Sequence, residues 1–206
     1  MVAFILWDAT DRNPYTDDYK CGDYAEDVHN IAESMGIRAG WVGIYFVNED
    51  AGHACNVFET TDRGLVYIDC TGENPEELPT SIAAPDVASV PKNESWDKVA
   101  YIQIGKEYGV IPLDKASGVS YGFYEQYKQD WEEYKRLLDE YNDEVNRYNE
   151  EIEGKVYYEG STELARIKDW EAELKAMKAV LDEMAARLGN YWFDTLGIVE
   201  KVDLHW

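Results

Sequence analysis

The chain has 206 residues, of which 42 are Asp or Glu and only 19 are Lys or Arg, so its formal net charge is −23. A surface with this charge repels phosphate backbones and anionic lipid, which argues against nucleic-acid or membrane-surface binding as the main role. Hydrophobic residues make up 45% of the chain and aromatic residues 14%, as expected of a folded domain with a real core.

The first apolar run, Val2 to Trp7, lacks a basic start and is too short for a secretory signal, and no later stretch reaches the length of a membrane span. We therefore expect a soluble chain without membrane contact. The sequence assigns no compartment, and it fits a domain of a larger exported protein as well as a separate protein. Its three cysteines do not suggest a disulfide framework, so at least one thiol should be free.

A helix is predicted from Cys21 to Gly36, where Tyr24, Val28, Ile31 and Met35 recur at helical spacing before a glycine stop. This places Cys21 in the first turn. The next run, Ile37 to Val47, is rich in β-branched and aromatic residues and predicts a strand.

Two further strands, His53 to Phe58 and Leu65 to Cys70, are joined by a turn-rich connection of hairpin length and should pair antiparallel. A hairpin centred near Thr61 sets His53 opposite Asp69 and Cys55 opposite Tyr67. Cys70 then points to the other side of the sheet, so no disulfide between Cys55 and Cys70 is expected.

The rest of the chain completes an α+β pattern and adds an insertion. A proline-rich surface loop is predicted over residues 72–95, followed by strands at 98–104 and 108–113. From Tyr124 onward apolar residues repeat every seven positions in two seams, which predicts an antiparallel coiled-coil hairpin of two helices of roughly 30 residues each. We assign residues 1–120 to a core, 121–190 to the inserted hairpin and 191–206 to a strand that returns to the core.

Cys21, His53 and Asp69 form the candidate catalytic site. A helix N-terminus favours a thiolate, because its unsatisfied backbone N–H groups and the helix dipole stabilise negative charge. A histidine can then take and return the proton, and an aspartate that accepts from the ring N–H fixes its tautomer. The paired strands supply both groups.

The runs YKCGDYAEDVHNIAESMGIRAGWVG, GHACNVFE and GLVYIDCTG, between Tyr15 and Gly72, resemble the core of the transglutaminase-like superfamily. The resemblance implies a papain-like α+β core in which Cys21 is the nucleophile, His53 the general base and acid, and Asp69 the orienting group. It also implies action on amide carbonyls, as in cross-linking enzymes, cysteine proteases and deglycosylating amidases. Little chain precedes Cys21, and the helical hairpin is not part of the family core.

The remaining candidates favour structural roles. His29 and His205 are interpreted as surface or packing residues, and Cys55 and Cys70 as core cysteines. Metal ligands would need two or more close pairs, and only His53 with Cys55 is one, so neither a metal nor another cofactor is predicted.

We therefore expect a thiol-dependent amidase or acyltransferase acting on a protein or peptide, with hydrolysis preferred over cross-linking. The alternative is a non-catalytic binding or assembly module that works through the helical arm. The tyrosine-rich seam of that arm is equally consistent with packing inside one hairpin and with a homodimer. The sequence does not identify the substrate.

Overall fold

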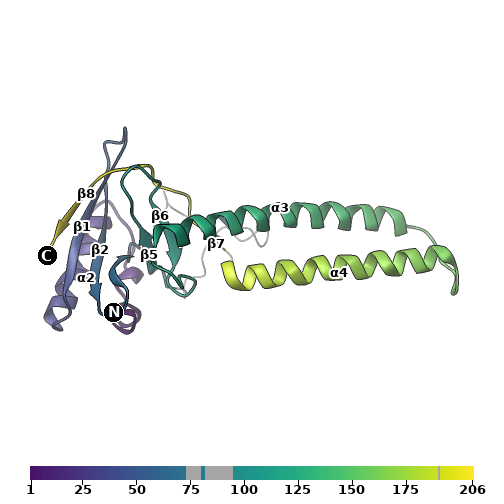
Figure 1. The fold of residues 1–206 in the computed structure, drawn as a ribbon, viewed down its shortest axis with the longest axis horizontal. Helices are drawn as coiled ribbons and strands as arrows, with labels where there is room; N and C mark the ends of the chain where they lie inside the picture. The colour runs from purple at the N-terminus through teal and green to yellow at the C-terminus, as the bar shows by residue number, and fades with distance from the viewer. Residues whose placement is uncertain (73–79, 82–94, 190) are drawn as a thin grey trace. The chain divides into compact units, whose positions relative to one another are not determined.

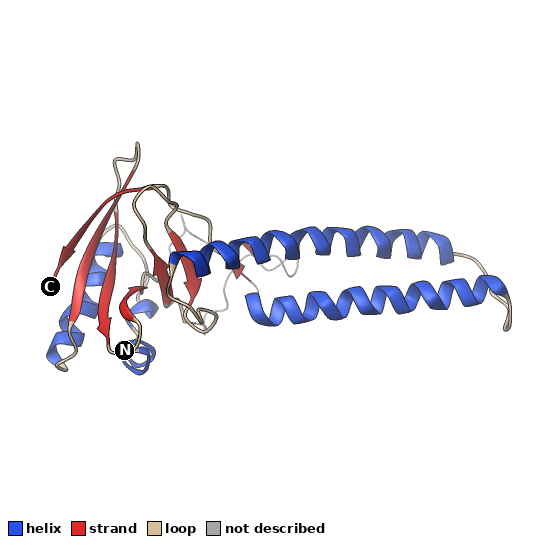
Figure 2. Cartoon of the chain, viewed as in Figure 1, coloured by secondary structure: helices blue, strands red, loops and turns tan. Residues whose placement is uncertain are grey.

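A computed structural model describes residues 1–72, 80–81, 95–189 and 191–206 of the chain (Figure 1). The backbone forms two compact units, one made of Met1–Glu125 with Tyr191–Trp206 and the other of Gln126–Asn190. The first unit combines helices with a six-stranded sheet in which every neighbouring pair is antiparallel (Figure 2). The predicted α+β class is confirmed.

The sheet has the strand order β6-β5-β3-β2-β1-β8. The last strand along the chain lies beside β1, so the C-terminal segment returns to the sheet. A separate two-stranded ribbon pairs β4 with β7. The strands are β1 Ala39–Phe46, β2 His53–Thr60, β3 Gly64–Asp69, β4 Thr80–Ser81, β5 Lys98–Tyr101, β6 Gly109–Pro112, β7 Tyr191–Trp192 and β8 Val199–His205.

Helix α2, Cys21–Ser34, packs on β1 and β2, and Gly36, two residues beyond its end, has a positive φ of 72°. Only glycine adopts that conformation without strain, so the predicted stop is where the sequence places it. The buried face of α2 consists of Tyr24, Ala25, Val28 and Ala32. The apolar run near the N-terminus forms a short helix, α1 Val2–Asp8, followed by the 3-10 turn η1 Thr10–Arg12.

The other face of the sheet carries a second apolar layer. It is centred on alternate residues of β1 and β2 and is closed by side chains from β5, β6, β8 and the loop before β6. Because side chains alternate along a strand, this layer and the layer beneath α2 use opposite faces of the same strands. The buried members are Val42, Ile44, Phe46, Cys55, Val57, Ala100, Tyr108, Val110 and Val199.

The register of the β2–β3 hairpin differs from the prediction by two residues. Val57 pairs with Tyr67, so the predicted pairing of Cys55 with Tyr67 is wrong. The last pair is Thr60 with Gly64, which leaves a three-residue loop centred on residue 62, and Gly64 has a φ of 72°. Three-residue hairpin loops commonly end on such a left-handed glycine, and this one fixes the register. Continued to the end of β3, the register sets Asp69 across from Cys55 and diagonal to His53.

The second unit consists of two long helices. α3 spans Tyr121–Ile152, beginning in the first unit, and α4 spans Thr162–Leu188. Within the unit they run in opposite directions, because the Tyr127 hydroxyl donates to the Leu188 carbonyl oxygen at 2.6 Å while the rings of Tyr148 and Trp170 lie 5.5 Å apart near the other end. The buried residues of α4 repeat every seven positions: Ile167, Leu174, Leu181 and Leu188.

The loop expected over residues 72–95 lies mostly outside the described residues. Among the helices in the described ranges, none is long and apolar enough to span a membrane.

Gly109 tests the packing at the start of α3. A Cβ at this position would sit 2.2–2.5 Å from ring atoms of Tyr124, whose ring is stacked between those of Tyr101 and Trp192. We expect Gly109→Ala to lower the free energy of unfolding by about 1–3 kcal/mol, because the ring has no space to give way. Urea unfolding followed by circular dichroism measures it. The matched variant Gly122→Ala, whose Cβ meets nothing within 4 Å, should be neutral or slightly stabilising, and equal stability of the two variants would contradict this packing.

Candidate active site

Cys21 is the first residue of α2 and its side chain is partly exposed. The preceding residue, Lys20, is the N-cap, and its backbone N–H donates to the Asp23 carboxylate at 2.8 Å. The helix start is therefore fixed by a local hydrogen bond, and the thiol occupies the first turn, as predicted.

Two contacts between α2 and the sheet indicate which part of β2 lies beside the start of α2. The ring of His29 lies 2.7 Å from the Ala39 carbonyl oxygen, beside the far end of β2, and the Asn56 side chain donates to the Ala25 carbonyl oxygen at 2.8 Å. Four helical residues rise about 6 Å, close to the length of two strand residues. By this spacing Cys21, four residues before Ala25, is expected near the level where β2 starts.

His53 opens β2, and Asp69 closes β3. The two side chains are 5% and 1% exposed, and His53 Nε2 lies 2.9 Å from Asp69 Oδ2. An ionised carboxylate only accepts hydrogen bonds, so Nε2 carries the proton and, in the neutral ring, Nδ1 carries the lone pair. The structure therefore brings together two of the three predicted residues.

Cys55 lies between His53 and Val57 on one face of β2, across from Asp69. Burial raises the pKa of the Cys55 thiol well above its usual value, and the nearby Asp69 and Cys21 act in the same direction. The Cys21 thiol is therefore within electrostatic range of Cys55.

The Asp69 carboxylate has further partners that the sequence did not reveal. The Tyr108 hydroxyl donates to Oδ2 at 2.9 Å, the Thr71 backbone N–H donates to Oδ1 at 2.9 Å, and Lys98 Nζ lies 3.8 Å from Oδ1. Burial by itself would raise the pKa of Asp69, but the charge of Lys98, the His53 ring with its hydrogen bond, and the hydrogen bond from the Thr71 backbone N–H hold it well below its usual range. Asp69 is thus held as a carboxylate.

Lys98 is only 4% exposed. It is the direct cross-strand neighbour of Asp69, and its ammonium donates to the carbonyl oxygens of Thr71 and Trp96, both at 2.9 Å. In the sequence it is a single lysine at the head of the apolar run KVAYIQI. That position was the only signal for it, and its meaning depends on the pairing of β5 with β3.

A second pair of buried carboxylates lies next to this lysine. Asp11 and Asp97 are 3% and 4% exposed, Asp11 accepts from the Trp96 backbone N–H at 2.7 Å, and Asp97 accepts from the Ser95 hydroxyl at 2.8 Å. Burial and the charge of Asp11 raise the pKa of Asp97 to about 6. This pair is strained electrostatically near neutral pH.

The two other histidines lie apart from Asp69, and Cys70 follows it directly in the chain. His29 bonds to a backbone carbonyl, His205 is exposed beside the ring of Trp41, and Cys70 is buried. All three cysteines of the chain are free thiols. Within the described ranges, no group of three or more His, Cys, Asp or Glu side chains is arranged to hold a metal ion.

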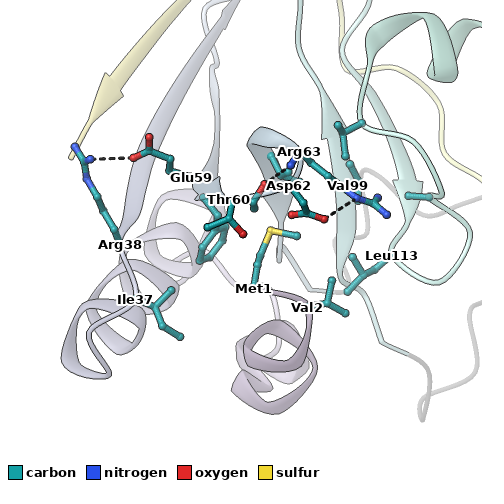
Figure 3. Close-up of a pocket in the computed structure, with 15 residues that line it drawn as sticks. Met1, Val2, Ile37, Arg38, Glu59, Thr60, Asp62, Arg63, Val99 and Leu113 are labelled. Atoms are coloured by element: carbon teal, nitrogen blue, oxygen red, sulfur yellow. Dashed lines mark hydrogen bonds and ion pairs between the residues drawn. The ribbon is translucent and has the colours of Figure 1, made fainter.

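A hollow of about 480 Å³ lies at the opposite end of β2, beside the turn that joins β2 to β3 (Figure 3). Its charged rim residues are paired with one another, Arg38 with Glu59 at 3.0 Å and Arg63 with Asp62 at 3.6 Å. It contains neither His53 nor Asp69, so we do not assign it to the candidate site.

The pH dependence of the protein's stability tests the interaction between Asp11 and Asp97. Because the folded-state pKa of Asp97 lies above its ordinary value of 3.8, the folded protein keeps a proton that the unfolded chain releases, and the free energy of unfolding falls as pH rises from about 4 to 6. Asp97→Asn should remove this loss and stabilise the protein at pH 7 by up to about 2 kcal/mol. Thermal unfolding at pH 4, 5, 6 and 7 measures the difference from wild type. The exposed control Asp17→Asn should show no difference in stability from wild type. An Asp97→Asn variant less stable than wild type at pH 7 would contradict the unfavourable burial of the Asp97 charge beside Asp11.

Comparisons with known proteins identified no relative of this chain. No protein-family model, no curated protein and no solved structure matches this chain. The chemistry of Cys21, His53 and Asp69 has to follow from their own surroundings.

Proposed function

We propose that this chain is a thiol-dependent amide hydrolase or acyltransferase in which Cys21 is the nucleophile, His53 the general base and acid, and Asp69 the group that orients the imidazole. The observation that carries the proposal is the buried hydrogen bond from His53 Nε2 to Asp69 Oδ2. This bond leaves Nδ1 as the basic nitrogen of the neutral ring, which is what proton exchange with a thiol requires.

The reaction would proceed in two halves. His53 takes the proton of Cys21, the thiolate attacks the amide carbonyl, and backbone N–H groups at the start of α2 are candidates to stabilise the oxyanion. The imidazolium returns the proton to the departing amine as the carbon–nitrogen bond breaks, leaving a thioester on Cys21. Water or a second amine, deprotonated by His53, then attacks the thioester and releases the thiol. All proton transfers pass through His53, so the scheme calls for no cofactor.

The class of substrate follows from the resemblance to the transglutaminase-like superfamily. Its papain-like core implies a protein or peptide amide as the substrate, and hydrolysis is preferred over transfer to an amine. Two findings support the resemblance without depending on it: the cysteine opens a helix, and the histidine and aspartate lie on paired strands.

A peptide carrying a thiol-reactive electrophile tests the nucleophile. Intact-mass spectrometry should find one adduct on the wild-type chain, located at Cys21, because the other two thiols are buried and burial raises their pKa. Cys21→Ala should abolish labelling, whereas the matched Cys55→Ala variant should be labelled like wild type. Equal labelling of wild type and Cys21→Ala would refute the assignment.

The acyl acceptor is decided by the product. Incubation with a peptide library and a primary amine, followed by mass spectrometry, distinguishes cleavage, deamidation and amine incorporation by their different mass changes. Cleavage or deamidation that is lost in Cys21→Ala is the expected result.

A second candidate function is assembly through α3 and α4, which we propose to form a coiled-coil hairpin. Toward the end of α3 the seam residues Leu138, Tyr141, Val145 and Tyr148 are only half-buried, unlike Trp131 and Tyr134 nearer its start. Apolar side chains left partly open in this way favour a homodimer formed through the hairpin.

Sedimentation velocity tests the homodimer. The wild-type chain should sediment as a dimer at micromolar concentration, and Tyr141→Glu with Tyr148→Glu should convert it to a monomer by placing charge in the seam. Glu140→Gln, an exposed neighbour, is the matched control. A wild-type chain that stays monomeric up to high concentration rules the dimer out.

A further inference from the structure

The Asp69 carboxylate is shared among more groups than a simple histidine–aspartate pair needs. His53 Nε2 and the Tyr108 hydroxyl both lie 2.9 Å from the same oxygen, Oδ2. The other oxygen, Oδ1, faces the Thr71 backbone N–H and the Lys98 ammonium. A neutral donor and a cation thus compete with His53 for one negative charge.

We propose that Lys98 and Tyr108 are positioning residues that limit the charge Asp69 offers to His53 and so keep the imidazole neutral and able to act as a base near neutral pH. This inference rests on the proposed function for its catalytic meaning, but the sharing of Asp69 does not depend on Cys21.

The physical reason is the competition between charges in a buried site. A carboxylate beside a histidine favours the imidazolium, and an unopposed one in a dry interior would hold the ring protonated. Lys98 cancels much of that negative charge and also repels a proton on His53. Tyr108 draws electron density from Oδ2 through its hydrogen bond, and its ring lies edge-on to that of His53 with centroids 5.3 Å apart.

Lys98 is held in this role by its surroundings. Its ammonium is fixed by two backbone carbonyls and lies 5.6 Å from the ring of Phe193 and 6.0 Å from that of Trp96. Other ionisable groups around Asp69 and Lys98 are Asp97, which Lys98 also stabilises as a carboxylate, and Asp194, which lines the same small hollow as Lys98 and Tyr108. The thiols of Cys21, Cys55 and Cys70 are also nearby. Among these neighbours Lys98 carries the positive charge, so its removal should change the net charge around Asp69 and His53 the most.

Histidine NMR measures the proposal directly. The chain has three histidines, so the ring signals of His53 can be followed against pH with His29 and His205 as internal references. In Lys98→Met the pH at which His53 takes up its proton should rise by about one unit, since Lys98 disfavours a second positive charge nearby and a neighbouring charge shifts such groups by roughly 1–3 units. Lys98→Arg keeps the charge and should restore the wild-type midpoint. Lys106→Met, an exposed lysine paired with Glu125, should leave it unchanged.

Tyr108→Phe keeps the ring and removes only the hydroxyl, so it provides a second reading if Lys98→Met does not fold. In this variant the pH midpoint of His53 protonation should also rise, by less than in Lys98→Met. A midpoint that stays unchanged or falls in Tyr108→Phe and in any folded Lys98→Met would overturn the proposal.

The same variants separate this inference from the proposed function. If wild-type Cys21 fails to react with the peptide electrophile while the His53 midpoint rises as expected, the enzymatic assignment fails and the charge-sharing stands. If Cys21 reacts but neither variant moves the His53 midpoint, the charge-sharing fails and the enzymatic assignment stands.

Discussion

The Asp69 carboxylate, which is 1% exposed, sets the condition that the rest of the first unit has to meet. A charge taken out of water costs several kcal/mol unless it is paired and hydrogen-bonded. Here the compensation comes from β2 through His53, from β5 through Lys98, from the loop before β6 through Tyr108, and from the Thr71 backbone. Except for the Thr71 backbone, which is local, these groups come near Asp69 only when the sheet has formed, so completing the fold and assembling the site are one event.

The strand order makes this arrangement necessary. β3 lies between β2 and β5, so its last residue receives the histidine from one neighbour and the lysine from the other. The helix that carries Cys21 is tied to β2 by the hydrogen bond from Asn56 to the Ala25 carbonyl oxygen. A shift of β2 would therefore displace the thiol's helix and the imidazole together.

Much of this could be predicted because the signals are local. The helix that starts at Cys21, the two hairpin strands that carry His53 and Asp69, and the two long helices all follow from spacing and stop residues within each segment. The hairpin register could not be predicted to the residue, because it depends on a three-residue loop closed by Gly64 in a left-handed conformation. Lys98 and Tyr108 were missed because they reach Asp69 only through the pairing of β5 with β3 and the return of the following loop, contacts that no spacing in the sequence encodes.

The central claim is that the His53–Asp69 pair activates the Cys21 thiol. The rate at which iodoacetamide alkylates Cys21 at pH 7 tests it most directly, because only a few per cent of an ordinary thiol is thiolate at that pH. We expect the wild-type chain to react roughly tenfold faster than free cysteine, and His53→Ala to react at about the rate of the free amino acid. A wild-type rate no faster than that of free cysteine, or one that His53→Ala leaves unchanged, would contradict the claim.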